Sequence, residues 1–154
     1  MQNRQGVGRR LPALAIAMLL PLLAANAPVA RHDVTVTVTD LRSGDGKVLA
    51  CLTAKPKAFP DCDRDPKAHA VTVDAAETVS FTFRGVAPGD YAISLLHDEN
   101  GNGKADRSLM VPKEGFGFSR DAKVRFGPPS FSSAAFEVRG GATHQTIRMR
   151  YLFR

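Results

Sequence analysis

Apolar residues recur at every second position along most of the chain, which is the spacing of half-buried β-strands. Three valines alternate with three threonines over residues 34–39, and the same alternation returns at 78–83. Further strands are expected over residues 48–52, 70–73, 91–96, 134–138 and 143–153. A glycine-rich turn at 43–46 predicts that the first two strands pair as a hairpin.

About seven short strands separated by turn residues, with no amphipathic helix after residue 27, are typical of an all-β fold. We expect an antiparallel β-sandwich of the transthyretin-like or immunoglobulin-like type, with a small barrel as the alternative. After residue 96 the strand pattern stops for about 35 residues rich in Gly, Pro, Asn and Phe. Irregular segments of that length are uncommon inside a compact domain and are often functional. Residues 28–154 are expected to form a single domain.

The N-terminal segment has the three-part layout of a secretory signal peptide. A basic stretch ends at residue 10, an apolar run extends from Leu11 to Ala25, and small residues follow. This run is shorter than the roughly 20 apolar residues that span a bilayer. We expect residues 1–27 to be a cleaved signal peptide, with an uncleaved anchor as the alternative. The mature chain is then periplasmic or secreted, without stable membrane insertion.

The charge of the chain is modest once this leader is set aside. The full sequence has 21 Lys and Arg residues against 15 Asp and Glu residues. The first 27 residues hold three arginines and no acid, which leaves 18 basic and 15 acidic residues and a net charge of +3. Such a small excess argues against nucleic acid as a partner. A cell-envelope component or a glycan is expected instead, and nothing in the sequence defines an oligomeric state.

The chain has two cysteines, Cys51 and Cys62, separated by ten residues. In an oxidising compartment an even pair at this spacing predicts a disulfide bond. The bond would hold the proline-rich and acidic segment 54–69 as a loop, and would contribute about 2–4 kcal/mol to stability. Two buried free thiols are the alternative.

The most specific motif is a loop that resembles the first part of a calcium-binding loop. Oxygen-bearing side chains stand at loop positions one, three, five and nine, which are Asp98, Asn100, Asn102 and Asp106. Position six is Gly103, and position seven, Lys104, would donate its backbone carbonyl. Position twelve is Leu109 instead of a bidentate glutamate, so the loop is no EF-hand, and Glu114 is the candidate to complete the shell. We expect weak calcium binding, about 10⁻⁴–10⁻³ M. A metal-free loop closed by Asx turns is the alternative.

Two further groups of residues are candidates for chemistry or binding. His97 stands beside Asp98 and Glu99, which suggests acid-base catalysis, although no nucleophile motif or second nearby histidine supports it. Phe116, Phe118 and Phe131 lie among basic residues, and such rings form a platform for a sugar or peptide when they face solvent. Their alternative role is to fold inward as a lid on the sandwich.

Several motifs together resemble one bacterial family. They are Pro88-Gly-Asp-Tyr-Ala92, His97-Asp-Glu-Asn-Gly-Asn-Gly-Lys104, Pro112-Lys-Glu-Gly-Phe-Gly-Phe-Ser119, Gly127-Pro-Pro-Ser-Phe131 and Ala134-Ala-Phe136. In this order they resemble the family called domain of unknown function 2141. The resemblance implies a small exported protein with a transthyretin-like sandwich, and it implies no particular activity.

We therefore predict a non-catalytic exported module that binds or supports a component of the cell envelope, with a calcium-stabilised loop. One alternative is a small periplasmic hydrolase that uses His97 with Asp98 or Glu99. The other is a carbohydrate or anionic-polymer binder that uses the Phe116–Phe131 loops.

Overall fold

The structure, a computed structural model, describes residues 29–103, 107–108 and 111–152. The expected signal peptide, residues 1–27, lies outside the described residues, as do Lys104 and Asp106 of the candidate calcium loop. No helix within the described ranges is long and apolar enough to cross a membrane. The first described strand begins at His32, inside the expected mature domain.

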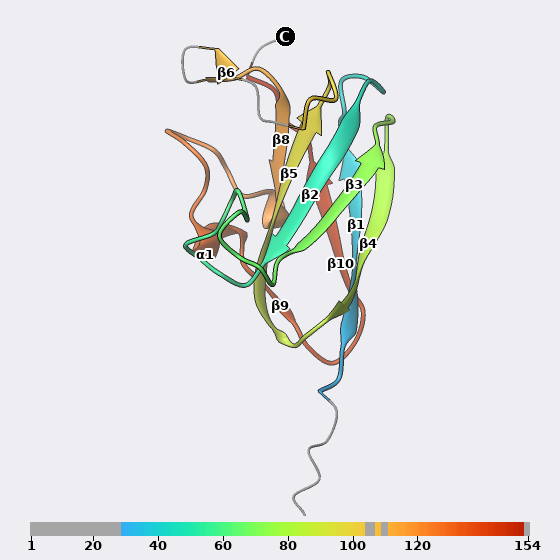
Figure 1. Ribbon diagram of the computed structural model, residues 1–154, viewed down its shortest axis with the longest axis vertical. Coiled ribbons are helices and arrows are strands. Elements are labelled where there is room, and N and C mark those ends of the chain that lie inside the picture. Colours follow the sequence, from blue (N-terminus) through green and yellow to red (C-terminus); the bar gives the residue numbers. More distant parts are fainter. Residues whose placement is uncertain (1–28, 104–106, 109–110, 153–154) are drawn as a thin grey trace, which may run out of the picture.

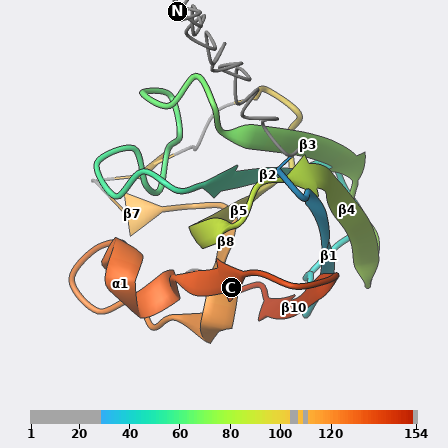
Figure 2. The same cartoon turned by 90° about the horizontal axis from the view of Figure 1, so that it is seen from below.

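Two β-sheets pack face to face, as Figures 1 and 2 show. The first has three strands in the order β10 (Thr143–Arg148), β1 (His32–Thr39) and β4 (Val79–Val86). The second has the order β3 (His69–Asp74), β2 (Lys47–Thr53), β5 (Gly89–Asp98) and β8 (Gly115–Phe118), with β9 (Phe136–Val138) also paired to β5. This arrangement confirms the predicted all-β sandwich.

Short elements order part of the segment between β5 and β9. β6 (Arg107–Ser108) and β7 (Val111–Pro112) form a small antiparallel pair. A 3₁₀ helix, η1 (Ser119–Asp121), follows β8, and one helical turn, α1 (Phe131–Ala134), precedes β9. The segment expected to be irregular is therefore partly regular, and β9 starts two residues later than predicted because α1 includes Ala134.

Alternating side chains place one face of each strand in the core between the sheets. In β1 the three valines are fully buried, whereas the threonines between them are partly exposed. β2 contributes Val48, Ala50 and Leu52 from the opposite sheet. Burying a Val or Leu side chain contributes roughly 1.5–3 kcal/mol, so this two-layer core is the main source of stability.

The predicted hairpin between the first two strands is wrong. β1 pairs with β4 in antiparallel and with β10 in parallel orientation, whereas β2 pairs with β3 and β5. The turn at 43–46 therefore connects the two sheets. Period-two alternation specifies which face of a strand is buried and leaves open which strand lies beside it. β1 and β2 lie in opposite sheets, and their buried faces pack against the same core from its two sides.

The sequence pattern also did not predict β8. Gly115 and Gly117 turn toward the main core, where an added Cβ would lie 2.3 Å from the Tyr151 ring and 2.8 Å from Ile147 Cγ2, respectively. Glycine is required at both positions because these side chains approach the strand so closely. The last strand is shorter than expected: β10 ends at Arg148, and Arg150 pairs with Phe116 as an isolated bridge.

A second apolar cluster lies on the outer face of β5 and β8. Its buried members are Ala92, Phe116, Phe118, Ala122 and Ala134, and Phe59, Val124 and Phe131 pack against them. Phe59 belongs to the loop 54–68, and its ring meets those of Phe118 and Phe131 edge to face, with centroids 5.7 and 6.1 Å away. The disulfide between Cys51 and Cys62 confirms the predicted pairing and ties this loop to β2.

Candidate functional site

The candidate chemistry lies where β5 ends, at the top of Figure 1. Successive strand residues point to opposite faces, so His97 faces the main core and Asp98 faces outward. Two other segments meet β5 here: the turn 43–46 between the sheets, and the chain after β10, which carries Tyr151. The three adjacent residues His97, Asp98 and Glu99 therefore have separate environments.

His97 is fully buried, and both of its ring nitrogens are hydrogen-bonded. Nε2 lies 2.8 Å from the carbonyl oxygen of Asp45. Because a carbonyl oxygen only accepts, Nε2 carries a proton and donates it, and Nδ1 is hydrogen-bonded to the Tyr151 hydroxyl at 2.7 Å. The Tyr151 oxygen in turn accepts the backbone N–H of Arg42 at 3.1 Å. The His97 ring thus cross-links β5, the turn and the C-terminal segment.

Glu99 is held by the same turn. Its carboxylate accepts the Ser43 hydroxyl at 3.1 Å and forms an ion pair with the Arg42 guanidinium, which also lies 4.5 Å from the centre of the Tyr151 ring. The hydrogen bond from Arg42 holds the pKa of Glu99 below its ordinary value, against the opposing effect of burial. Glu99 is therefore an anchored anion that stabilises the end of the sandwich.

The loop after β5 curls around Asp98, whose side chain is buried. Its carboxylate oxygens accept the backbone N–H groups of Asn102 at 3.1 Å and Gly103 at 2.7 Å. Asn100 Oδ1 also accepts the Asn102 N–H, at 3.0 Å. Gly101 and Gly103 have positive φ, which glycine adopts without strain. The first six positions of the predicted calcium loop therefore form a tight turn with Asp98 at its centre.

The structure describes only part of the predicted ligand set. Lys104 and Asp106 lie outside the described residues, and Glu114 is buried. The hydrogen bond with Glu99 raises the pKa of Arg42, and the charge of Glu114 adds to this effect. Among the residues that the structure describes, no three His, Cys, Asp or Glu side chains are grouped closely enough to hold a metal ion. The calcium site thus stays a prediction that rests on the loop as a whole.

Of the three phenylalanines predicted to contact a ligand, Phe116 and Phe118 are buried and Phe131 is partly buried. All three belong to the second cluster, as the inward-folding interpretation expects. Among the described phenylalanines, the fully exposed ring is Phe126, which lies within the Phe116–Phe131 loops of the predicted platform. The sequence feature that indicates this exposure is Gly127-Pro-Pro129, directly after Phe126, because these turn-forming residues place the preceding ring at the tip of a loop.

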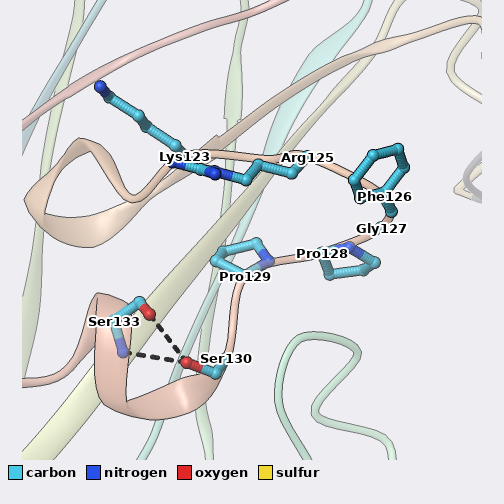
Figure 3. Close-up of a pocket in the computed structure, with 8 residues that line it drawn as sticks. All are labelled: Lys123, Arg125, Phe126, Gly127, Pro128, Pro129, Ser130 and Ser133. Atoms are coloured by element: carbon cyan, nitrogen blue, oxygen red, sulfur yellow. Dashed lines mark hydrogen bonds between the residues drawn. The ribbon is translucent and has the colours of Figure 1, made fainter.

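Two surface cavities lie away from His97, Asp98 and Glu99. One, of about 410 Å³, is shown in Figure 3 and is lined by Lys123, Arg125, Phe126, Gly127, Pro128, Pro129, Ser130 and Ser133. The other, of about 370 Å³, is lined by Ala54, Lys55, Asp65, Pro66, Lys67 and Tyr91. Cavities of this size are in the range of small-ligand sites. Both combine cationic side chains with apolar or aromatic rings.

Two arginines at the end of the chain, Arg148 of β10 and Arg150 after it, have partners within the fold. Asp121 of η1 accepts the Arg148 backbone N–H at 3.0 Å and its guanidinium at 2.8 Å, and lies 3.9 Å from the Arg150 guanidinium. Burial alone would raise the pKa of Asp121, but the hydrogen bonds from Arg148 outweigh it and hold that pKa below its ordinary value near 3.8. Arg148 and Arg150 thus attach η1 to the last strand.

Replacing Asp121 by asparagine is expected to reduce the free energy of unfolding at neutral pH by about 0.5–1 kcal/mol, because the pair is partly exposed and screened. Asparagine tolerates the φ of +51° at this position. A carboxyl with a lowered folded pKa stabilises the fold above its unfolded pKa, and this contribution is lost as the pH falls through the folded pKa. The difference in the free energy of unfolding between the wild type and Asp121→Asn should therefore vanish in acid.

Urea unfolding between neutral pH and about pH 2 would measure this difference. The exposed Asp63→Asn serves as the control. A difference that does not depend on pH would contradict the prediction.

Comparison with known proteins identifies the family. A family described as "Uncharacterized protein conserved in bacteria (DUF2141)" matches residues 36–146, which include most of the sandwich, the disulfide and the loop around Asp98. No curated protein and no solved structure matches the chain. The match spans well over half of the sequence and agrees with the motifs that suggested it. The chain therefore belongs to the DUF2141 family of bacterial proteins.

Proposed function

We propose that this chain is a non-catalytic exported module that binds or supports a component of the cell envelope. The observation that carries the proposal is the environment of His97. A general base must reach the proton that it abstracts, whereas both nitrogens of this buried ring are bonded to Tyr151 and to the Asp45 carbonyl. The side chains that suggested a hydrolase thus have structural partners.

The two carboxylates beside His97 support the same proposal. Asp98 accepts two backbone N–H groups of its own loop, and Glu99 is paired with Arg42. Neither lines the cavities of about 410 and 370 Å³. Hydrolysis of a chromogenic ester or phosphate ester that disappears in a folded His97→Gln variant would contradict the proposal.

We further propose that calcium closes the loop that begins at Asp98. The donors would be the side-chain oxygens of Asp98, Asn100, Asn102, Asp106 and Glu114 and the carbonyl of Lys104, all oxygen ligands as a hard cation requires. The tight turn around Asp98 supports this proposal, because a carboxylate oxygen that accepts one N–H keeps a second lone pair for an ion.

Calcium at about 5 mM is expected to stabilise the protein by about 1–2 kcal/mol, because binding to the folded state alone shifts the unfolding equilibrium. The melting temperature should rise by about 3–8 °C relative to chelator. Thermal melts followed by circular dichroism would measure the shift, with Asp106→Asn expected to abolish it and Asp63→Asn to leave it unchanged. Identical melts together with no heat of binding in calorimetry would eliminate the calcium site.

A further inference from the structure

The loop between η1 and α1 presents an aromatic ring to solvent. Phe126 is fully exposed at the point where the loop turns, as Figure 3 shows. Arg125 directly precedes Phe126 in the chain, and Lys123 stands near the start of the loop with its side chain pointing away from the ring (Figure 3). Neither cation forms an ion pair within the described part of the chain. Residues 122–136 contain no Asp or Glu. The loop therefore combines an uncovered ring with an uncompensated positive charge.

This loop extends from a well-packed base. Ala122 at its start and Ala134 after its end are buried in the second cluster. At its C-terminal end, Ser130 Oγ accepts the Ser133 backbone N–H at 3.3 Å and caps α1. Pro128 and Pro129 restrict the returning arm. The ring is thus held away from both sheets, so its exposure does not result from a frayed terminus.

From this loop we infer a docking surface for anionic phospholipid. Phe126 enters the headgroup region, and Lys123 and Arg125 contact lipid phosphates. The inference rests on the proposed envelope function and names the component that is bound. Phe126 is fully exposed in the folded protein, so burial of its ring requires a partner that surrounds it, as an acyl–headgroup interface does.

A soluble anionic polymer fits these observations less well. Such a polymer would be held by Lys123 and Arg125 through charge, but it would leave most of the Phe126 surface in water. Two cations and one ring give weak, reversible binding that decreases with salt. The interaction is therefore peripheral docking on the membrane surface.

Vesicle co-sedimentation of the processed protein, recovered from the periplasm of an expressing bacterium, tests the inference. We expect binding to phosphatidylcholine vesicles only when they contain phosphatidylglycerol, and only at low salt. Phe126→Ser should weaken partitioning about tenfold. Lys123→Gln and Arg125→Gln should each weaken it about fivefold. All variants share one N-terminus, so any contribution from that end is the same in each.

Matched controls remove exposed residues of the same types elsewhere. Leu152→Ser removes another exposed apolar side chain, and the single variants Arg84→Gln and Lys67→Gln each remove one exposed positive charge, as each loop variant does; these controls should keep wild-type partitioning. Equal losses in the controls, or binding that does not depend on Phe126, would overturn the inference. So would binding to a soluble polyuronate without binding to vesicles. None of these results bears on the proposal that the protein is non-catalytic, which the ester-hydrolysis assay tests separately.

Discussion

Gly46→Ala is expected to destabilise the fold by about 3 kcal/mol, although the position lies in a surface turn. An added Cβ would lie 2.0 Å from the Asp98 carbonyl oxygen and 2.8 Å from two backbone atoms of Glu99. Backbone atoms of a paired strand cannot move aside cheaply, and overpacking of this kind costs about 1–3 kcal/mol. The φ of +69° at Gly46 adds about 1 kcal/mol of strain for alanine. Urea unfolding at neutral pH would measure the loss.

Gly44→Ala in the same turn is the matched control. Its Cβ would meet Ala75 O at 3.7 Å, an ordinary contact, and its backbone does not need positive φ. We expect a change within about 0.5 kcal/mol. Equal effects of the two substitutions would contradict the close approach of this turn to β5. Such a result would also weaken the case for the Asp45–His97 hydrogen bond, because that bond depends on the same approach.

Removing the disulfide by Cys51→Ala with Cys62→Ala is expected to cost about 3 kcal/mol, since the bond restricts a short loop in the unfolded chain. The loop 54–68 also carries Phe59 against Phe118 and Phe131, so the second cluster should loosen. Denaturant midpoints with and without reductant would measure the loss.

Reductant should destabilise the wild type by a similar amount and leave the double-alanine variant unchanged. A wild type whose midpoint ignores reductant, with both thiols then shown by labelling to be free, would contradict a stabilising role for the bond. A double-alanine variant that still responds to reductant would point to an effect unrelated to these two cysteines.

The alternation of Val and Thr in β1 was sufficient to predict a strand and its buried face, because side chains on a strand alternate regardless of the neighbouring strand. The same pattern could not show that β1 and β2 lie in different sheets. It also missed β8, where glycines 115 and 117 face the core and Phe116 and Phe118 face the second cluster. Both faces of β8 are buried, so no polar face marks it in the sequence.

The candidate site divides in the same way. Local sequence identified the calcium-like loop, since Asp98 and the glycines act within a few residues of one another. The partners of His97 come from Asp45 and Tyr151, 52 and 54 residues away, and no local pattern indicates them.

By itself the sequence determined the all-β class, the pairing of Cys51 with Cys62 and the identity of the family, because these depend on side-chain periodicity, cysteine number and ordered motifs. Only the tertiary structure decided which aromatic rings are covered. Phe116 and Phe118 are buried because the disulfide-tied loop and α1 cover them, whereas Phe126 extends beyond that cover. Hydrophobicity drives all three rings out of water equally, and the packing of distant segments determines which of them is buried.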